Sequence, residues 1–199
     1  MSARTTPRKT TPMNTTLTTL AATLTATIIT VVPMAAIHTT TAADTVESTP
    51  AVALASTVKI SAFDKSLLKA VNLARATKHV CAGVTYKPAK PVAWNTKLAK
   101  AAEGHSTEMA TKNYLSHNSA NGASAFTRIK STGYRYTAAG ENIAAGYNTP
   151  ASIVKAWLAS PEHCKVLMNK AYTQIGTGYY TGAGLYQHYT TADFGKPAK

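Results

Sequence analysis

Two histidines and one glutamate, all in polar, turn-rich segments, are the residues of this chain best suited to chemistry. His117 lies just beyond a predicted helix, Glu141 lies in Gly-Glu-Asn-Ile-Ala at 140–144, and His163 lies in Ser-Pro-Glu-His-Cys at 160–164. Imidazole and carboxylate groups together can bind a divalent cation or pair for acid–base work. Their separations of 24 and 22 residues match no local metal motif. Spacing alone therefore leaves open the alternative that each is an ordinary polar side chain.

Two further histidines have less distinctive surroundings. His105 falls on the apolar face of a predicted helix, which favours a hydrogen-bonded core histidine over a ligand. His188 lies on the last predicted strand, between Gln187 and Tyr189, and the sequence indicates no partner for it.

The chain has two cysteines, Cys81 and Cys164, which are 83 positions apart. Two lone cysteines in a chain with an export signal favour a disulfide over a metal site. The alternatives are two reduced buried thiols, or a catalytic Cys164 beside His163. The second of these is weak, because adjacent side chains on a helix point apart.

The N-terminal part has the order of a secretory signal. The cationic residues Arg4, Arg8 and Lys9 precede a moderately apolar run at 17–37, and small residues suited to cleavage follow at 41–43. The alternative is an uncleaved membrane anchor, but the run contains several threonines and a proline, whereas a spanning helix needs about 20 predominantly apolar residues. We expect a secreted protein whose signal peptide is removed.

These patterns divide the chain into three parts. We expect a signal peptide at 1–43, a linker or frayed terminus at 44–62, and one folded domain at 63–197. The domain pattern is α+β. Predicted helices run from Asp64 to Lys78, from Asn95 to about 113, over 125–131, from Thr149-Pro150 onward and from Ser160-Pro161 to Met168, and predicted strands cover 141–145, 172–180 and 185–194.

Composition narrows the class of protein. Lys and Arg number 21 against 8 Asp and Glu, a net charge of +13. Three of those cations and none of the acids precede Asp44, so the mature chain keeps a net charge of +10. This charge favours an anionic surface as partner. We expect no nucleic-acid binding, because the cations are scattered and no nucleic-acid-binding motif is present. A serine hydrolase is also disfavoured, since there is no Gly-x-Ser-x-Gly elbow.

A series of short motifs spread over about residues 64–195 carries a family resemblance. In order they are Trp94-Asn95, His105-Ser106, Met109-Ala110, Tyr114-Leu115-Ser116-His117, Gly140-Glu141-Asn142-Ile143-Ala144, Trp157-Leu158-Ala159-Ser160-Pro161 with His163, Ile175-Gly176-Thr177-Gly178 and Asp193-Phe194-Gly195. The chain resembles the CAP superfamily (cysteine-rich secretory proteins, antigen five, pathogenesis-related one, and the related venom allergens) in its bacterial SCP-like form. Seven motifs in the right order, with His105-Ser106 and Met109-Ala110 counted together because they lie on one helix, make the match specific.

The resemblance implies a fold and a cleft. The expected fold is an α-β-α sandwich with a three-stranded antiparallel sheet between helical layers, located outside the cytoplasm. In many eukaryotic members a central cleft is lined by two histidines and two acidic residues that can bind a divalent metal such as zinc.

Transferred to this chain, the resemblance assigns the first cleft histidine to His117 and an acid to Glu141. The second histidine is either His163 or His188, because counting back from the closing Asp-Phe-Gly motif places Tyr189 at the family position. Ser160 replaces the remaining acid. A zinc site would then have three protein ligands, His117, Glu141 and His163, and Ser160 and Asn142 would orient the site through hydrogen bonds.

The resemblance implies no general catalytic activity, so three functions remain. The first is an exported binding module whose cleft takes a lipid, sterol, glycan or peptide, with or without a divalent metal. The second is a metal-assisted hydrolase in which Glu141 is a ligand or general base. The third is a cell-wall protein held by charge alone.

Overall fold

The structure is a computed structural model, and it describes residues 59–199. The predicted signal peptide and most of the predicted linker lie outside the described residues. Among the described residues, no helix is both long and apolar enough to span a membrane. The helices are α1 (Ala62–Arg75), α2 (Thr96–Thr111), α3 (Ala125–Ser131), α4 (Pro150–Ala159) and α5 (Pro161–Met168), and the strands are β1 (His79–Cys81), β2 (Val84–Tyr86), β3 (Ala93–Trp94), β4 (Tyr136–Ala145), β5 (Gln174–Thr181) and β6 (His188–Pro197).

The central sheet corrects the predicted three antiparallel strands. Four strands lie in the order β3-β5-β6-β4, and β3 runs parallel to β5 while the other pairs are antiparallel. The short strand β3 forms because the chain is extended where it enters α2, with the Ala93 amide donating to the Thr173 carbonyl and the Asn95 amide to the Ile175 carbonyl. The sheet is therefore mixed, and β4 is an edge strand.

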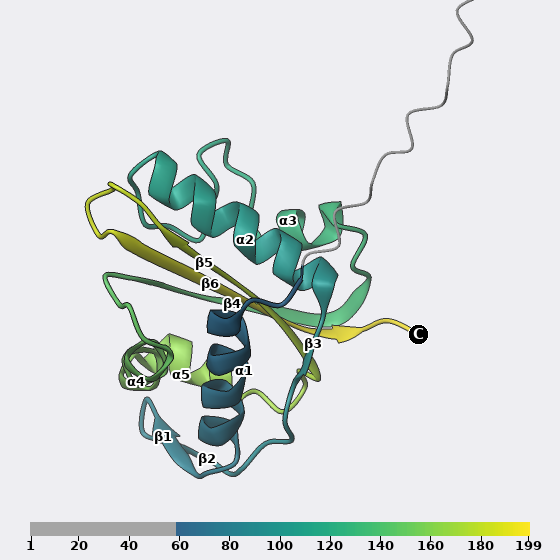
Figure 1. The fold of residues 1–199 in the computed structure, drawn as a ribbon. Helices are drawn as coiled ribbons and strands as arrows, with labels where there is room; N and C mark the ends of the chain where they lie inside the picture. Colours follow the sequence, from purple (N-terminus) through teal and green to yellow (C-terminus); the bar gives the residue numbers. More distant parts are fainter. Residues whose placement is uncertain (1–58) are drawn as a thin grey trace, which may run out of the picture. The chain divides into compact units, whose positions relative to one another are not determined.

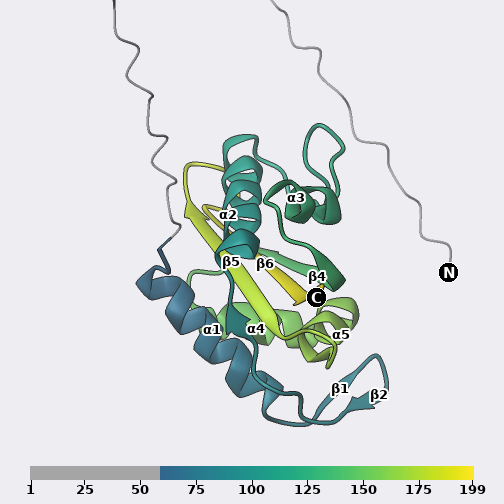
Figure 2. The ribbon, with the colours of Figure 1, turned by 90° about the vertical axis from the view of Figure 1, so that its right-hand side faces the viewer.

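Helices cover both faces of this sheet, as the α+β prediction requires. Figure 1 shows α2 and α3 on one side and α1, α4 and α5 on the other, and the turned view in Figure 2 agrees. The larger apolar cluster lies between the sheet and the α1, α4 and α5 layer. It includes Trp157, whose indole nitrogen donates to the Ile143 carbonyl at 2.9 Å and so ties α4 to β4. Two smaller clusters lie beneath α2.

Side-chain caps set where the helices begin. Ser61, rather than the predicted Asp64, caps α1, since its hydroxyl accepts from the Asp64 amide. Asn95 caps α2 and Thr149 caps α4, as predicted. Pro150 occupies the first turn of α4, where its missing N–H leaves no helical hydrogen bond unmade.

Two glycines let α2 lie directly on β5. A Cβ atom built on Gly176 would come within 1.9 Å of the Ala99 backbone nitrogen, and one on Gly178 within 2.3 Å of the Glu103 backbone. No side chain fits in that space. The close approach fixes the height of α2 above the sheet, and hence the position of the loop that follows it.

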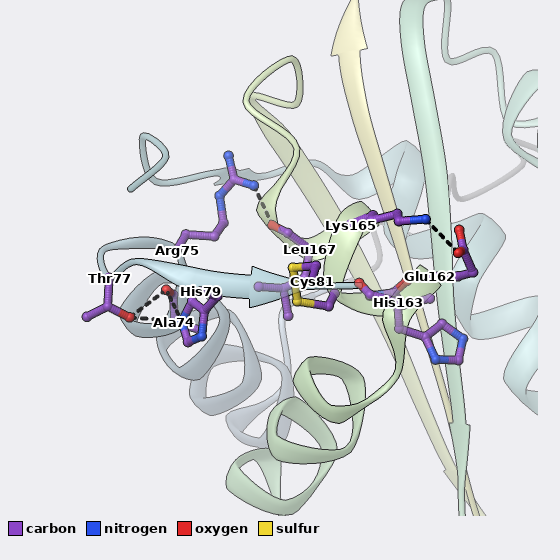
Figure 3. Close-up of a disulfide and its surroundings, with 11 residues drawn as sticks. Ala74, Arg75, Thr77, His79, Cys81, Glu162, His163, Lys165 and Leu167 are labelled. Carbon is purple, nitrogen blue, oxygen red and sulfur yellow. Dashed lines mark hydrogen bonds and ion pairs between the residues drawn. A yellow bond between two sulfur atoms is a disulfide. The ribbon is translucent and has the colours of Figure 1, made fainter. Parts of the chain in front are cut away.

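A hairpin of β1 and β2, which the sequence did not predict, follows α1 and is attached to α5. The predicted disulfide between Cys81 and Cys164 is present, and it joins β1 to α5. Figure 3 shows this bond at the end of β1. Beside it the guanidinium of Arg75, which is fully buried, donates to the backbone carbonyls of Lys90, Leu167, Asn169 and Tyr172. These bonds hold α1, α5 and the following loop together.

Candidate functional site

Glu141 lies on the edge strand β4, and its face is set by strand register. It pairs with Asp193 of β6, which pairs in turn with Gly176 of β5. Because directly paired residues project to the same face of a sheet, Glu141 faces the α2 layer with Gly176. Asn142, the next residue, faces α5 instead.

His117 meets Glu141 from the loop after α2. Its Nδ1 atom lies 2.7 Å from Oε1 of Glu141. The Glu141 side chain is only 3% exposed, whereas that of His117 is 53% exposed. Since a carboxylate accepts hydrogen bonds, Nδ1 carries a proton, and in the neutral form of the ring Nε2 is then a free acceptor on a half-exposed side chain.

Arg128 of α3, for which the sequence indicated no role in the site, holds the other side of the same carboxylate. Its guanidinium donates to Oε2 of Glu141 and also to the His117 carbonyl, the Ser119 hydroxyl and the Ala123 carbonyl. Both oxygens of Glu141 are therefore engaged. Nothing local in the sequence pairs a basic residue in α3 with an acid 13 positions later.

His163 approaches from the opposite helical layer. It lies near the start of α5, and its ring centre is 5.9 Å from that of His117. Its backbone carbonyl accepts from the Asn142 side chain at 3.0 Å, so Asn142 ties β4 to the start of α5. Because β4 is the edge of the sheet, residues from both layers meet beside it. Burial, followed by the proximity of His117, lowers the pKa of His163 below its ordinary value.

His188 and Ser160 lie apart from this cluster. The His188 ring stacks on Tyr179, whose hydroxyl lies 2.8 Å from Nδ1 of His188. Tyr179 also stacks on Phe63 of α1, so His188 belongs to the α1 side of the sheet, opposite to Glu141. The structure thus places His163, and not His188, beside His117. Ser160 ends α4 and precedes α5, and its hydroxyl makes no capping hydrogen bond.

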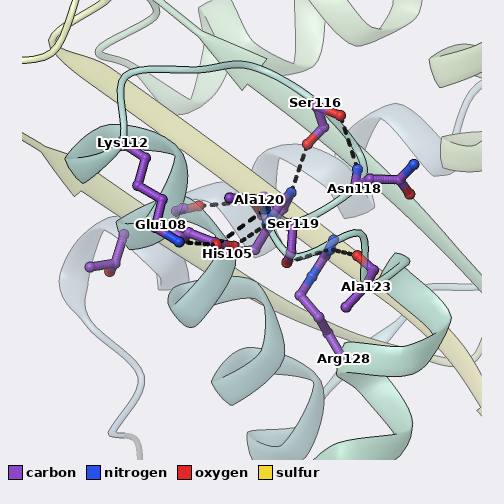
Figure 4. Close-up of polar contacts among 12 residues, drawn as sticks. His105, Glu108, Lys112, Ser116, Asn118, Ser119, Ala120, Ala123 and Arg128 are labelled. Atoms are coloured by element: carbon purple, nitrogen blue, oxygen red, sulfur yellow. Dashed lines mark hydrogen bonds and ion pairs between the residues drawn. The ribbon is translucent and has the colours of Figure 1, made fainter.

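His105 is a fully buried core histidine, as predicted, and it also supports the loop that carries His117. Its Nε2 atom lies 2.8 Å from the Ser116 carbonyl, so Nε2 carries the proton and donates. Burial is the main cause that lowers the pKa of His105. Glu108, one turn later on α2, accepts from Lys112 and from the Ala120 amide of the same loop, as Figure 4 shows.

Asp193 lies directly across from Glu141 and is fully buried. Neither of its carboxyl oxygens has a hydrogen-bond partner in the described part of the chain. Burial raises the pKa of Asp193 well above its ordinary value, and the nearby charge of Glu141 raises it further. Asp193 therefore keeps its proton more readily than an ordinary aspartate does, because a second carboxylate beneath the pair of Arg128 and Glu141 would repel the first.

The cluster does not fit the metal site that the family resemblance implies. A metal bound to Glu141 would compete with Arg128 and His117, each of which hydrogen-bonds one of its oxygens, and the Arg128 cation would repel it. Within residues 59–199, no three His, Cys, Asp or Glu side chains are grouped so that they could hold a metal ion. The arrangement instead presents two imidazoles supported by a buried, fully hydrogen-bonded carboxylate.

The fold agrees with comparison to known proteins. The cysteine-rich secretory protein (CAP) family model matches residues 68–194. The chain belongs to this family.

Three similar proteins illustrate the range of the match. An uncharacterized Bacillus subtilis protein, YkwD, is 35% identical over 127 residues, which are 64% of this chain and 46% of that protein. An extracellular SCP-domain protein of Bacillus anthracis is 31% identical, with a TM-score of 0.48, over 54% of this chain and 34% of that one. An outer surface protein of Borrelia burgdorferi is 19% identical, with a TM-score of 0.57, over 71% of this chain and 97% of that one. The chain spans less than half of the curated relative YkwD.

Proposed function

We propose that this protein is a binding module outside the cytoplasm that binds a polar glycan or peptide at His117 and His163 without a metal ion. Three observations support the location. The family is described as secretory, the N-terminal sequence has the order of an export signal, and the disulfide is typical of oxidising compartments.

The observation that carries the binding proposal is that only one nitrogen of the His117 ring is used within the protein. Nδ1 is turned inward to Glu141, so Nε2 faces outward as a hydrogen-bond acceptor. Hydroxyl groups of a sugar and amide N–H groups of a peptide are the matching donors. A hydrocarbon tail offers no such donor and a sterol offers only one hydroxyl, which favours the glycan and the peptide over the lipid and the sterol.

The buried support makes this acceptor rigid. Glu141 is held by Arg128, and Arg128 also donates to the His117 carbonyl, so the ring and its backbone are fixed together. A site that is already ordered loses less conformational entropy when it binds. The same contacts disfavour the hydrolase alternative, because the Arg128 guanidinium and the His117 ring each hydrogen-bond one oxygen of Glu141 and would compete with a water molecule that Glu141 has to activate.

Isothermal titration calorimetry with soluble peptidoglycan fragments, in buffer containing EDTA, tests the proposal. These fragments carry both sugar hydroxyls and peptide amides, and palmitate provides the lipid comparison. We expect saturable binding of the fragments that weakens about tenfold in His117→Ala, the value of about one hydrogen bond. His188→Ala is the matched control, because it removes an imidazole from the opposite face of the sheet.

Two results would overturn the proposal. One is binding of the fragments that appears only after zinc is added. The other is equal affinity in wild type and His117→Ala.

A further inference from the structure

A groove lies between the β1–β2 hairpin, α5 and the loop after α5. Its volume is about 590 Å³. Lys87, Lys165 and Lys170 line it together with Tyr86 and Tyr172. We call it the lysine groove. A volume of this size suits a ligand larger than a single small ion.

The groove is separate from the cluster of His117 and His163, although α5 contributes to both. His163 and Lys165 are two residues apart on this helix, and successive residues turn by about 100° around a helix axis. Their side chains therefore leave the helix in nearly opposite directions, about 200° apart. Figure 3 shows the two side chains on α5 beside the disulfide.

The two chain segments that wall the groove are almost free of acidic residues. No Asp or Glu occurs at 76–102 or at 163–192. The nearest acid is Glu162, whose carboxylate lies 2.7 Å from the Lys165 ammonium. The Glu162 side chain is 79% exposed, and an exposed pair of this kind contributes little to stability, so an anionic ligand can replace Glu162.

The walls of the groove are held in place before any ligand arrives. The disulfide from Cys81 to Cys164 ties the hairpin wall to α5. The buried guanidinium of Arg75 binds the carbonyls of Leu167, Asn169 and Tyr172, which fixes the helix end and the loop of the other wall. Three cationic side chains on a pre-organised frame lose little backbone entropy on binding.

From this juxtaposition we propose that the lysine groove binds a linear anionic polymer. Several lysines along one groove match regularly spaced anions better than they match one small anion. Lysine ammonium groups bind phosphate and similar anions as point charges, and the excess positive charge of the domain draws such a polymer to the surface.

Binding of short linear inorganic polyphosphate to the disulfide-intact protein, measured by calorimetry at several salt concentrations, tests this proposal. The test variant carries Lys87→Gln, Lys165→Gln and Lys170→Gln. The control variant carries the same number of charge changes on exposed lysines of α1 and α2, namely Lys65→Gln, Lys69→Gln and Lys100→Gln.

We expect the groove variant to bind polyphosphate about tenfold more weakly and to lose about two units of slope in the logarithmic salt dependence. The control variant should change affinity by no more than about threefold, the effect of net charge alone. Free inorganic phosphate should bind wild type much more weakly than the polymer. Thermal unfolding of both variants confirms that they are folded.

Equal losses in the two variants would overturn the proposal, because binding would then follow net charge and not the groove. Equal affinity for phosphate and polyphosphate would also overturn it. Failure of this proposal can be told apart from failure of the proposed function, because His117 does not line the groove and His117→Ala leaves every residue of the groove in place.

Discussion

Arg128 is expected to stabilise the fold chiefly through Glu141. The Arg128 side chain is 11% exposed and that of Glu141 is 3% exposed, so Arg128→Gln leaves a buried carboxylate without its cation. Breaking a buried pair from one side costs about 3–5 kcal/mol. The variant also loses contacts to the loop that carries His117. We expect the free energy of unfolding, measured by urea denaturation, to fall by an amount in this range.

A double-mutant cycle with Glu141→Gln separates the pair from its surroundings. The double variant also removes the buried, unpaired carboxylate of Glu141, so we expect it to be more stable than Arg128→Gln alone by about 2 kcal/mol. Lys112→Gln is the control, because it breaks the exposed pair with Glu108 and should cost less than about 1 kcal/mol. A cost for Arg128→Gln as small as that of this control would refute the reasoning.

Three further predictions concern stability. Cys81→Ser should lower the free energy of unfolding by about 4–5 kcal/mol, since the disulfide closes a separation of 83 residues, and calorimetric melting without reductant checks it. Gly176→Ala should cost about 3 kcal/mol or more in urea denaturation because its Cβ meets the α2 backbone, whereas Gly104→Ala has open space and should stabilise α2 by about 0.5–1 kcal/mol. Burial lowers the pKa of His105 and of His163, so the unfolded chain binds protons more readily, and stability should fall as pH drops through and below 6.5. Unfolding curves at a series of pH values should show this fall, and replacing both histidines by Gln should flatten it.

Helical periodicity predicted the helices well because their apolar faces and caps are local features. The boundaries that failed have identifiable causes. Ser61 competes with Asp64 as the cap of α1, and both are good capping residues. The two-residue strand β3 exists only because β5 lies beside it, which a local pattern does not contain. The β1–β2 hairpin has Ala82 and Gly83 at its turn, and the proline-containing stretch after it obscured its strand pattern.

The site was predictable where it lay in motifs and unpredictable where it depended on strand register. His117 and Glu141 lie in short motifs, and the structure brings them together. The choice between His163 and His188 could not be made from sequence, because the face on which His188 lies follows from its pairing with Thr181. The role of Arg128 could not be predicted, because its contact with Glu141 joins a short helix to a strand across a turn and no local pattern encodes it.

Nuclear magnetic resonance of the histidine ring nitrogens tests the central claim most directly. The measurement uses EDTA-treated, ¹⁵N-labelled protein titrated with soluble peptidoglycan fragments. We predict that His117 carries its proton on Nδ1 before titration and that its Nε2 signal shifts as an acceptor when the fragments bind, while His188 does not respond. Two results would contradict the claim that His117 and His163 form a polar binding site without a metal ion. One is a His117 ring that carries its proton on Nε2 and not on Nδ1. The other is an Nε2 signal that responds to zinc and not to the fragments.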